Sequence, residues 1–141
     1  MAVYHDIPGV DISFVAATDL TGLQYHFVKP GSVLGEVVVA NGASNPAPFG
    51  ILQNAPSPTQ EARVRLLGPS KLFCLTGATC GIAYGRFVTV NASGQGIPIA
   101  TEAGSPILAR NIGDTMAVSA SQFIEVFYFG AGLNACATSA S

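Results

Sequence analysis

A glycine-rich stretch, Ser93-Gly94-Gln95-Gly96, is the segment best suited to chemistry, because glycine loops bind phosphate through backbone N–H groups. A dinucleotide fingerprint needs a third glycine and a following helix, and a Walker-type loop needs a Lys after its second glycine. Neither is present, and the next residues, Ile97-Pro98-Ile99, cannot open a helix. We therefore predict that residues 91–96 are a hairpin loop in which glycine supplies a positive φ.

Acid–base candidates are few. His5 stands beside Asp6, and His26 alternates away from Tyr25 and Phe27, so it is expected to face solvent or a partner. Neither histidine has a Ser, a Cys or a carboxylate at a spacing that indicates a nucleophile and its base. We predict that the chain is not an enzyme.

Two arginines, Arg63 and Arg65, share one face of an expected strand with Glu61. This arrangement could clamp an anion, but a solvated or interfacial row of charges is the favoured interpretation. Arg63 and Arg65 are therefore candidate residues for contact with a partner protein.

The cysteines do not indicate a metal site. Cys74 and Cys80 flank the sequence LTGAT, Cys136 stands near the C-terminal end, and neither histidine is close in sequence. We predict no metal and no cofactor, with Cys74 and Cys80 as buried thiols. A Cys74–Cys80 disulfide across a hairpin is the alternative, and synthesis in the cytoplasm disfavours it.

Short alternating segments predict an all-β domain, with a small sandwich or barrel-like architecture. In residues 57–67, Ser57 and Pro58 could start a helix, but the alternation from Glu61 onward favours a strand preceded by a single turn. No internal repeat is evident. The other expected strands are DISFVAAT, LQYHFVKPG, GEVVVANG, FGILQN, KLFCLTG, GRFVTVN, GIPIATE, SPILARN, TMAVS and QFIEVFYFG.

The two ends differ from the β domain, which is expected at residues 12–129. Residues 1–11 combine apolar anchors with Pro8 and Gly9 and predict an extended N-terminal arm, whereas residues 130–141 are small and polar and predict a C-terminal tail. We expect the arm to contact another chain. Its candidate contact residues are Val3, Tyr4, Ile7 and Val10.

The composition predicts association with other protein chains. Hydrophobic residues make up 49% of the chain and charged residues 10%, against roughly 25% charged residues in a typical soluble domain. A surface with so few charges cannot avoid apolar patches. The net charge of −2 argues against nucleic acid, and no apolar run approaches the ~18 residues that span a membrane. No signal peptide is apparent, so we expect synthesis in the host cytoplasm.

The order of several short motifs resembles the small capsid cement, or decoration, proteins of tailed bacteriophages. This resemblance implies a small β domain, often trimeric, that binds the outside of a mature icosahedral head and clamps neighbouring major capsid subunits, without enzymatic activity or cofactor. The chain departs from the family in its long tail, its three cysteines and Arg110-Asn111. The matching residues are Gly50, Ile51, Leu52, Gln53 and Asn54, then Val88, Thr89, Gly94 and Gly96, then Ile124, Glu125 and Val126.

Together these observations predict a structural protein of the virion, on the capsid exterior. Its expected partners are the major capsid protein and copies of itself, as a trimer or alternatively a dimer, with neither nucleic acid nor membrane. The alternative is a β-rich module of a phage tail or fibre that binds a receptor or carbohydrate. The absence of Trp and the presence of only four Tyr disfavour that alternative, because carbohydrate sites usually need aromatic platforms.

Overall fold

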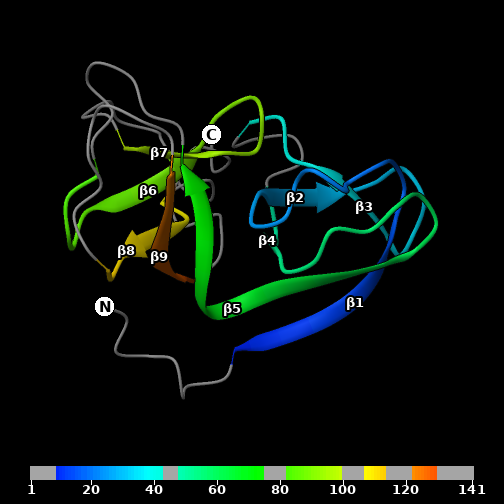
Figure 1. The fold of residues 1–141 in the computed structure, drawn as a ribbon, viewed down its shortest axis with the longest axis horizontal. Coiled ribbons are helices and arrows are strands. Elements are labelled where there is room, and N and C mark those ends of the chain that lie inside the picture. Colours follow the sequence, from blue (N-terminus) through cyan, green and yellow to red (C-terminus); the bar gives the residue numbers. More distant parts are fainter. Residues whose placement is uncertain (1–8, 43–47, 75–81, 100–106, 114–121, 130–141) are drawn as a thin grey trace, which may run out of the picture.

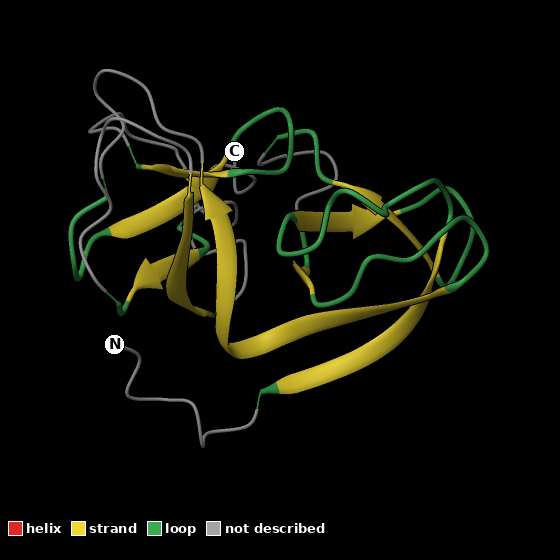
Figure 2. Ribbon diagram, viewed as in Figure 1, coloured by secondary structure: helices red, strands yellow, loops and turns green. Residues whose placement is uncertain are grey.

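The fold is all-β, as the sequence predicts. The computed structural model describes residues 9–42, 48–74, 82–99, 107–113 and 122–129, and within these ranges every regular element is a strand (Figure 2). No membrane-spanning helix is found in these ranges. The strands are β1 (Val10–Ala16), β2 (Phe27–Pro30), β3 (Glu36–Val39), β4 (Gly50–Leu52), β5 (Glu61–Cys74), β6 (Phe87–Val90), β7 (Gly96–Pro98), β8 (Ala109–Asn111) and β9 (Gln122–Tyr128).

The strands form two closed rings that share β5. Ring 1 contains β1 to β4 and the N-terminal half of β5, and ring 2 contains the C-terminal half of β5 and β6 to β9 (Figure 1). In ring 1, β1 pairs in parallel with β3, and the circuit continues through antiparallel pairs β3–β2, β2–β4, β4–β5 and β5–β1. Each ring is a small barrel-like unit.

Ring 2 repeats the topology of ring 1. Strand β5 pairs in parallel with β7, and the circuit continues through antiparallel pairs β7–β6, β6–β8, β8–β9 and β9–β5. Strand β5 therefore closes the first ring and opens the second. The two halves share strand order and orientation, so the structure contains an internal repeat. Most equivalent residues differ, which is why no repeat is evident in the sequence.

Backbone hydrogen bonds fix which residues of the two rings are equivalent. The N–H of Tyr25 donates to the carbonyl of Leu52 at 2.7 Å, and the N–H of Gly85 donates to the carbonyl of Asn111 at 2.8 Å. Both donors have left-handed backbone, with φ of 66° at Tyr25 and 83° at Gly85. Tyr25 and Gly85 are thus equivalent, and the strands that follow them begin with the equivalent pair Phe27 and Phe87.

The hairpins β2–β3 and β6–β7 are equivalent in the same way. The N–H of Gly31 donates to the carbonyl of Glu36 at 2.8 Å, and the N–H of Asn91 donates to that of Gln95 at 2.9 Å. In each hairpin the residue just before the acceptor is a left-handed glycine, Gly35 or Gly94. The predicted hairpin at residues 91–96 is confirmed.

Strand β5 bends where it passes between the rings (Figure 1). Sequence analysis predicts two strands on either side of Gly68-Pro69, whereas the structure has one continuous strand of 14 residues. Gly68 has φ of 117°, and the side chain of Arg65 donates to the carbonyl of Pro69 across the bend. Proline carries no N–H, so a position where the strand changes partners accommodates it.

Two clusters of buried residues make up the core, and one of them joins the rings. The interior of ring 1 is filled by Ala16, Leu20, Val28, Val37, Leu52, Ala62 and Val64. The core of ring 2 includes Val88, Ile124 and Val126, and it extends onto the outer wall of ring 1 through Phe27, Ala40 and Ile51. Ring 2 therefore packs on a wall of ring 1 rather than hanging from a flexible linker.

Two local predictions are confirmed and one is wrong. The alternating strand after Glu61 is present, and the turn before it is closed by the N–H of Gln60 donating to the carbonyl of Ser57 at 3.1 Å. Residues 23–26, by contrast, lie in a segment of turns rather than in the first half of the alternating strand expected at residues 23–31. Strand β1 begins at Val10, inside the segment expected to be an arm, and the expected strand at residues 115–119 lies outside the described residues.

Candidate functional site

Of the arm residues predicted to contact a partner, Val3, Tyr4 and Ile7 lie outside the described residues. Val10 starts β1 opposite Leu67, and its side chain is exposed. Contact of the arm with another chain stays a prediction.

The two predicted arginines have different environments. Arg65 forms an ion pair with Asp11 of β1 and also donates to the carbonyl of Pro69, so its guanidinium ties β1 to the bend in β5. Arg63 is exposed opposite Ser13, whose hydroxyl bonds the carboxylate of Glu61. The guanidinium of Arg65 is therefore bound within the chain, and Arg63 is the exposed arginine of the two.

His26 is buried, so the expectation that it faces solvent or a partner is wrong. It lies in the turns of residues 21–26, which do not follow the two-residue period of a strand, and its ring stacks on Phe73 at 5.2 Å. Its Nδ1 is 3.3 Å from the carbonyl of Gln24. Burial lowers the pKa of His26, because desolvation disfavours the charged imidazolium.

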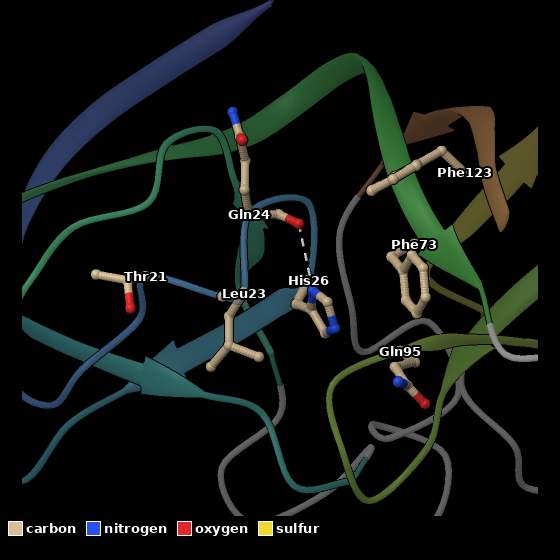
Figure 3. Close-up of a pocket in the computed structure, with 8 residues that line it drawn as sticks. Thr21, Leu23, Gln24, His26, Phe73, Gln95 and Phe123 are labelled. Atoms are coloured by element: carbon tan, nitrogen blue, oxygen red, sulfur yellow. Dashed lines mark hydrogen bonds between the residues drawn. The ribbon is translucent and has the colours of Figure 1, made fainter. Parts of the chain in front are cut away.

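An open hollow of about 510 Å³ lies beside His26, where ring 1 meets ring 2 (Figure 3). Phe73 and Phe123 contact edge to face at 5.1 Å, and Phe123 also contacts Tyr25 at 5.7 Å. The lining offers aromatic faces and amides but no carboxylate, thiol or ammonium group, so it suits binding better than acid–base chemistry. The lining residues are Thr21, Gly22, Leu23, Gln24, His26, Phe73, Gln95 and Phe123.

Cys74 is a free, buried thiol, as predicted. Burial raises its pKa, so the reactive thiolate is disfavoured. Cys80 and Cys136 lie outside the described residues. No group of metal-ligating side chains occurs among the residues that the structure describes.

The prominent surface feature is exposed apolar side chains in two groups. Ring 1 exposes Val10, Ile12, Val15, Val33, Leu34 and Leu67, and ring 2 exposes Tyr84, Phe87, Phe123 and Phe127. Sequence reasoning identified only Val10 among them. The Phe-Val shared by the starts of β2 and β6 could have shown that Phe27 and Phe87 are equivalent, but not that Phe27 is buried and Phe87 exposed.

Comparisons with known proteins show what the fold is similar to. No family model matches the chain, and no curated protein matches its sequence. Among solved structures, the fold is similar to the N base of the head fiber protein gp8.5 of bacteriophage phi29, with a TM-score of 0.61 and 13% sequence identity. The similarity covers 89% of this chain and 98% of that chain, so both rings belong to the shared fold.

Proposed function

We propose that this chain is a structural protein of a bacteriophage virion that attaches to the outside of the head. The observation that carries the proposal is the fold similarity to the base of a head fiber, which extends over nearly the whole of both chains. The sequence motifs, which resemble capsid cement proteins, point independently to the same surface of a phage head.

A non-enzymatic role fits the site. The hollow at the ring junction is lined by aromatic, amide and hydroxyl groups around a buried histidine whose pKa is lowered. None of these lining groups is a nucleophile with an adjacent base, which acyl or phosphoryl transfer would require.

The chain binds the major capsid protein and clamps neighbouring subunits, which stabilises the shell. The means of attachment are the arm of residues 1–11 and the exposed Arg63. Copies of the chain associate, as a trimer or alternatively a dimer, so that many weak contacts act together. With 10% charged residues, neighbouring copies on a crowded lattice repel one another little.

Co-sedimentation with purified heads of the phage that encodes the chain tests this function. The full chain should pellet with heads, a chain lacking residues 1–11 should pellet less, and Arg63→Ala should weaken binding moderately. The control Thr18→Glu changes an exposed position away from these residues and should pellet like the native chain. A full chain that remains in the supernatant would contradict the proposal.

A receptor- or carbohydrate-binding module is the second candidate, because the hollow places Phe73 and Phe123 beside Gln24 and Gln95. Aromatic faces next to amides are a common way to bind sugar rings. A glycan array discriminates the two functions. Specific binding that is lost in Phe123→Ala, together with no binding to heads, would favour the carbohydrate module.

A further inference from the structure

The contact between the two rings defines a seat on ring 1 and a part of ring 2 that fills it. The seat is the outer wall around Phe27 and Ile51, which are opposite one another on β2 and β4 and are fully buried. Tyr128 of ring 2 packs on Phe27 at 6.0 Å, and the turn of β6–β7 supplies the carbonyl of Gly94 to the N–H of Phe27 at 2.8 Å.

Two further contacts complete this junction. The amide of Gln53 in ring 1 donates to the hydroxyl of Ser70 at 2.9 Å. His26 of ring 1 and Gln95 of the β6–β7 hairpin line the same hollow (Figure 3). In each contact, the residue of ring 1 has an equivalent in ring 2, and the residue of ring 2 has an equivalent in ring 1.

Ring 2 carries the equivalent seat, and it is exposed. Phe87 and Arg110 are opposite one another on β6 and β8, as Phe27 and Ile51 are on β2 and β4. Phe87 is 40% exposed, and the guanidinium of Arg110 lies over its ring at 5.1 Å. Phe27 is covered by ring 2, whereas among the described residues Phe87 is only partly covered, by Arg110 and by Phe129, whose ring lies edge-on at 6.4 Å.

Ring 1 carries the counterpart of the ring 2 surface that covers Phe27, and this counterpart is also exposed. The turn between β2 and β3 corresponds to the turn that contacts Phe27, and it presents Val33, 58% exposed, and Leu34, fully exposed. The register of β1 and β9 on β5 makes Ile12 the equivalent of Ser70 and Val15 the equivalent of Phe73. The side chains of Ile12 and Val15 are exposed. Several exposed apolar side chains on the part of ring 1 that corresponds to a buried contact of ring 2 make it a candidate docking surface.

We propose that a second copy of this chain docks its ring 1 onto ring 2 of the first copy, in the way that ring 2 sits on ring 1 within one chain. The residue pairs at this joint are chemically compatible. Ile12 is the equivalent of Ser70, and Ile112 is the equivalent of Gln53. At the joint, Ile12 of one copy would therefore meet Ile112 of the other, and both are apolar. The equivalents of Gln95 and His26 are Glu36 and Arg86, which carry opposite charges.

This joint is heterologous, because each copy contributes its ring 1 to one neighbour and its ring 2 to another. Repeated addition closes into a ring of copies when the rotation permits, and otherwise continues as a filament. The inference rests on the internal repeat and does not depend on attachment to a phage head, so either proposal can fail without the other.

Two charge substitutions test the joint in the purified full chain by analytical ultracentrifugation. Leu34→Glu disables the turn of ring 1, and Phe87→Glu disables the seat of ring 2. Each variant alone should weaken self-association roughly 100-fold, as expected when a central contact is lost from an interface. Arg110→Glu serves as a second seat variant if Phe87→Glu unfolds, and Thr18→Glu is the matched control.

Mixing the two variants identifies the head-to-tail geometry. The intact turn of the Phe87→Glu chain still fits the intact seat of the Leu34→Glu chain, so the mixture should form a heterodimer of one copy each and nothing larger. A monomeric native chain, a Leu34→Glu chain that associates like the native one, or a mixture that stays monomeric would each overturn the proposal.

Discussion

Phe27 and Phe87 occupy the same position in the two rings, yet Phe27 is fully buried and Phe87 is 40% exposed. The difference arises because ring 2 covers the wall around Phe27, whereas the described part of the chain has no third ring over the wall around Phe87. One structural unit is thus used twice, and its second use leaves an apolar wall at the surface.

Truncation of the two phenylalanines should therefore have unequal effects on stability. We expect Phe27→Ala to lower the free energy of unfolding by about 3–5 kcal/mol, because it leaves a cavity in the core between the rings, and Phe87→Ala by about 1 kcal/mol. Urea denaturation of dilute protein, where association does not contribute, measures both. Equal losses would contradict the assigned burial.

Gly94 and Gly35 are an equally informative pair. Both have left-handed backbone, but a Cβ on Gly94 would lie 2.6 Å from Cγ2 of Val39 and 3.0 Å from the carbonyl oxygen of Phe27, whereas a Cβ on Gly35 would meet nothing within 4 Å. Gly94→Ala should therefore cost about 1–3 kcal/mol more than Gly35→Ala. Thermal unfolding of the two variants gives this difference, which should vanish if the turn of ring 2 does not touch ring 1.

Gly85 is needed for its backbone conformation alone. Its φ is 83°, and a Cβ there meets nothing within 4 Å, so Gly85→Ala should cost about 1–2 kcal/mol through strain. Gly22 is the control, since it is equally open but has no left-handed φ, and Gly22→Ala should leave stability unchanged or raise it by about 0.5 kcal/mol. Urea denaturation of the two variants should therefore give free energies of unfolding that differ by at least about 1 kcal/mol, with Gly85→Ala the less stable.

His26 predicts a loss of stability in mild acid. Its pKa is lowered in the folded chain, mainly by burial, so the unfolded chain binds a proton first as the pH falls through the ordinary value of about 6.5. The folded state therefore loses stability as the pH falls below about 7, and the loss continues until the folded chain also takes up the proton. His26→Gln removes this titration and should show a shallower decline across the same interval. Parallel declines in the two proteins would mean that His26 is not responsible.

The sequence was sufficient to predict the local features that depend on residue type alone. Alternation after Glu61 identified the start of β5, and the glycines at positions 94 and 96 identified the hairpin between β6 and β7. In both cases the side-chain period and the turn chemistry indicate the same structure. Low charge likewise anticipated exposed apolar side chains, although not their positions.

What the sequence did not reveal depends on tertiary contacts. In the sequence, Gly68-Pro69 looks like the end of a strand. In the structure β5 continues through it, because Arg65 bridges the bend and the strand exchanges partners there. His26 belongs to turns, in which alternation gives no information on burial. The repeat was missed because equivalent core positions hold different residues, as with Val37 and Gly96, which face Ala16 and Cys74.

The central claim, a structural role on the outside of a phage head, is tested most directly by cryo-electron microscopy of heads purified with and without this chain. The account predicts two-ring density on the outer surface that contacts major capsid subunits and is missing from particles that lack the chain. Identical particles in the two preparations, or density confined to the tail or the interior, would contradict it.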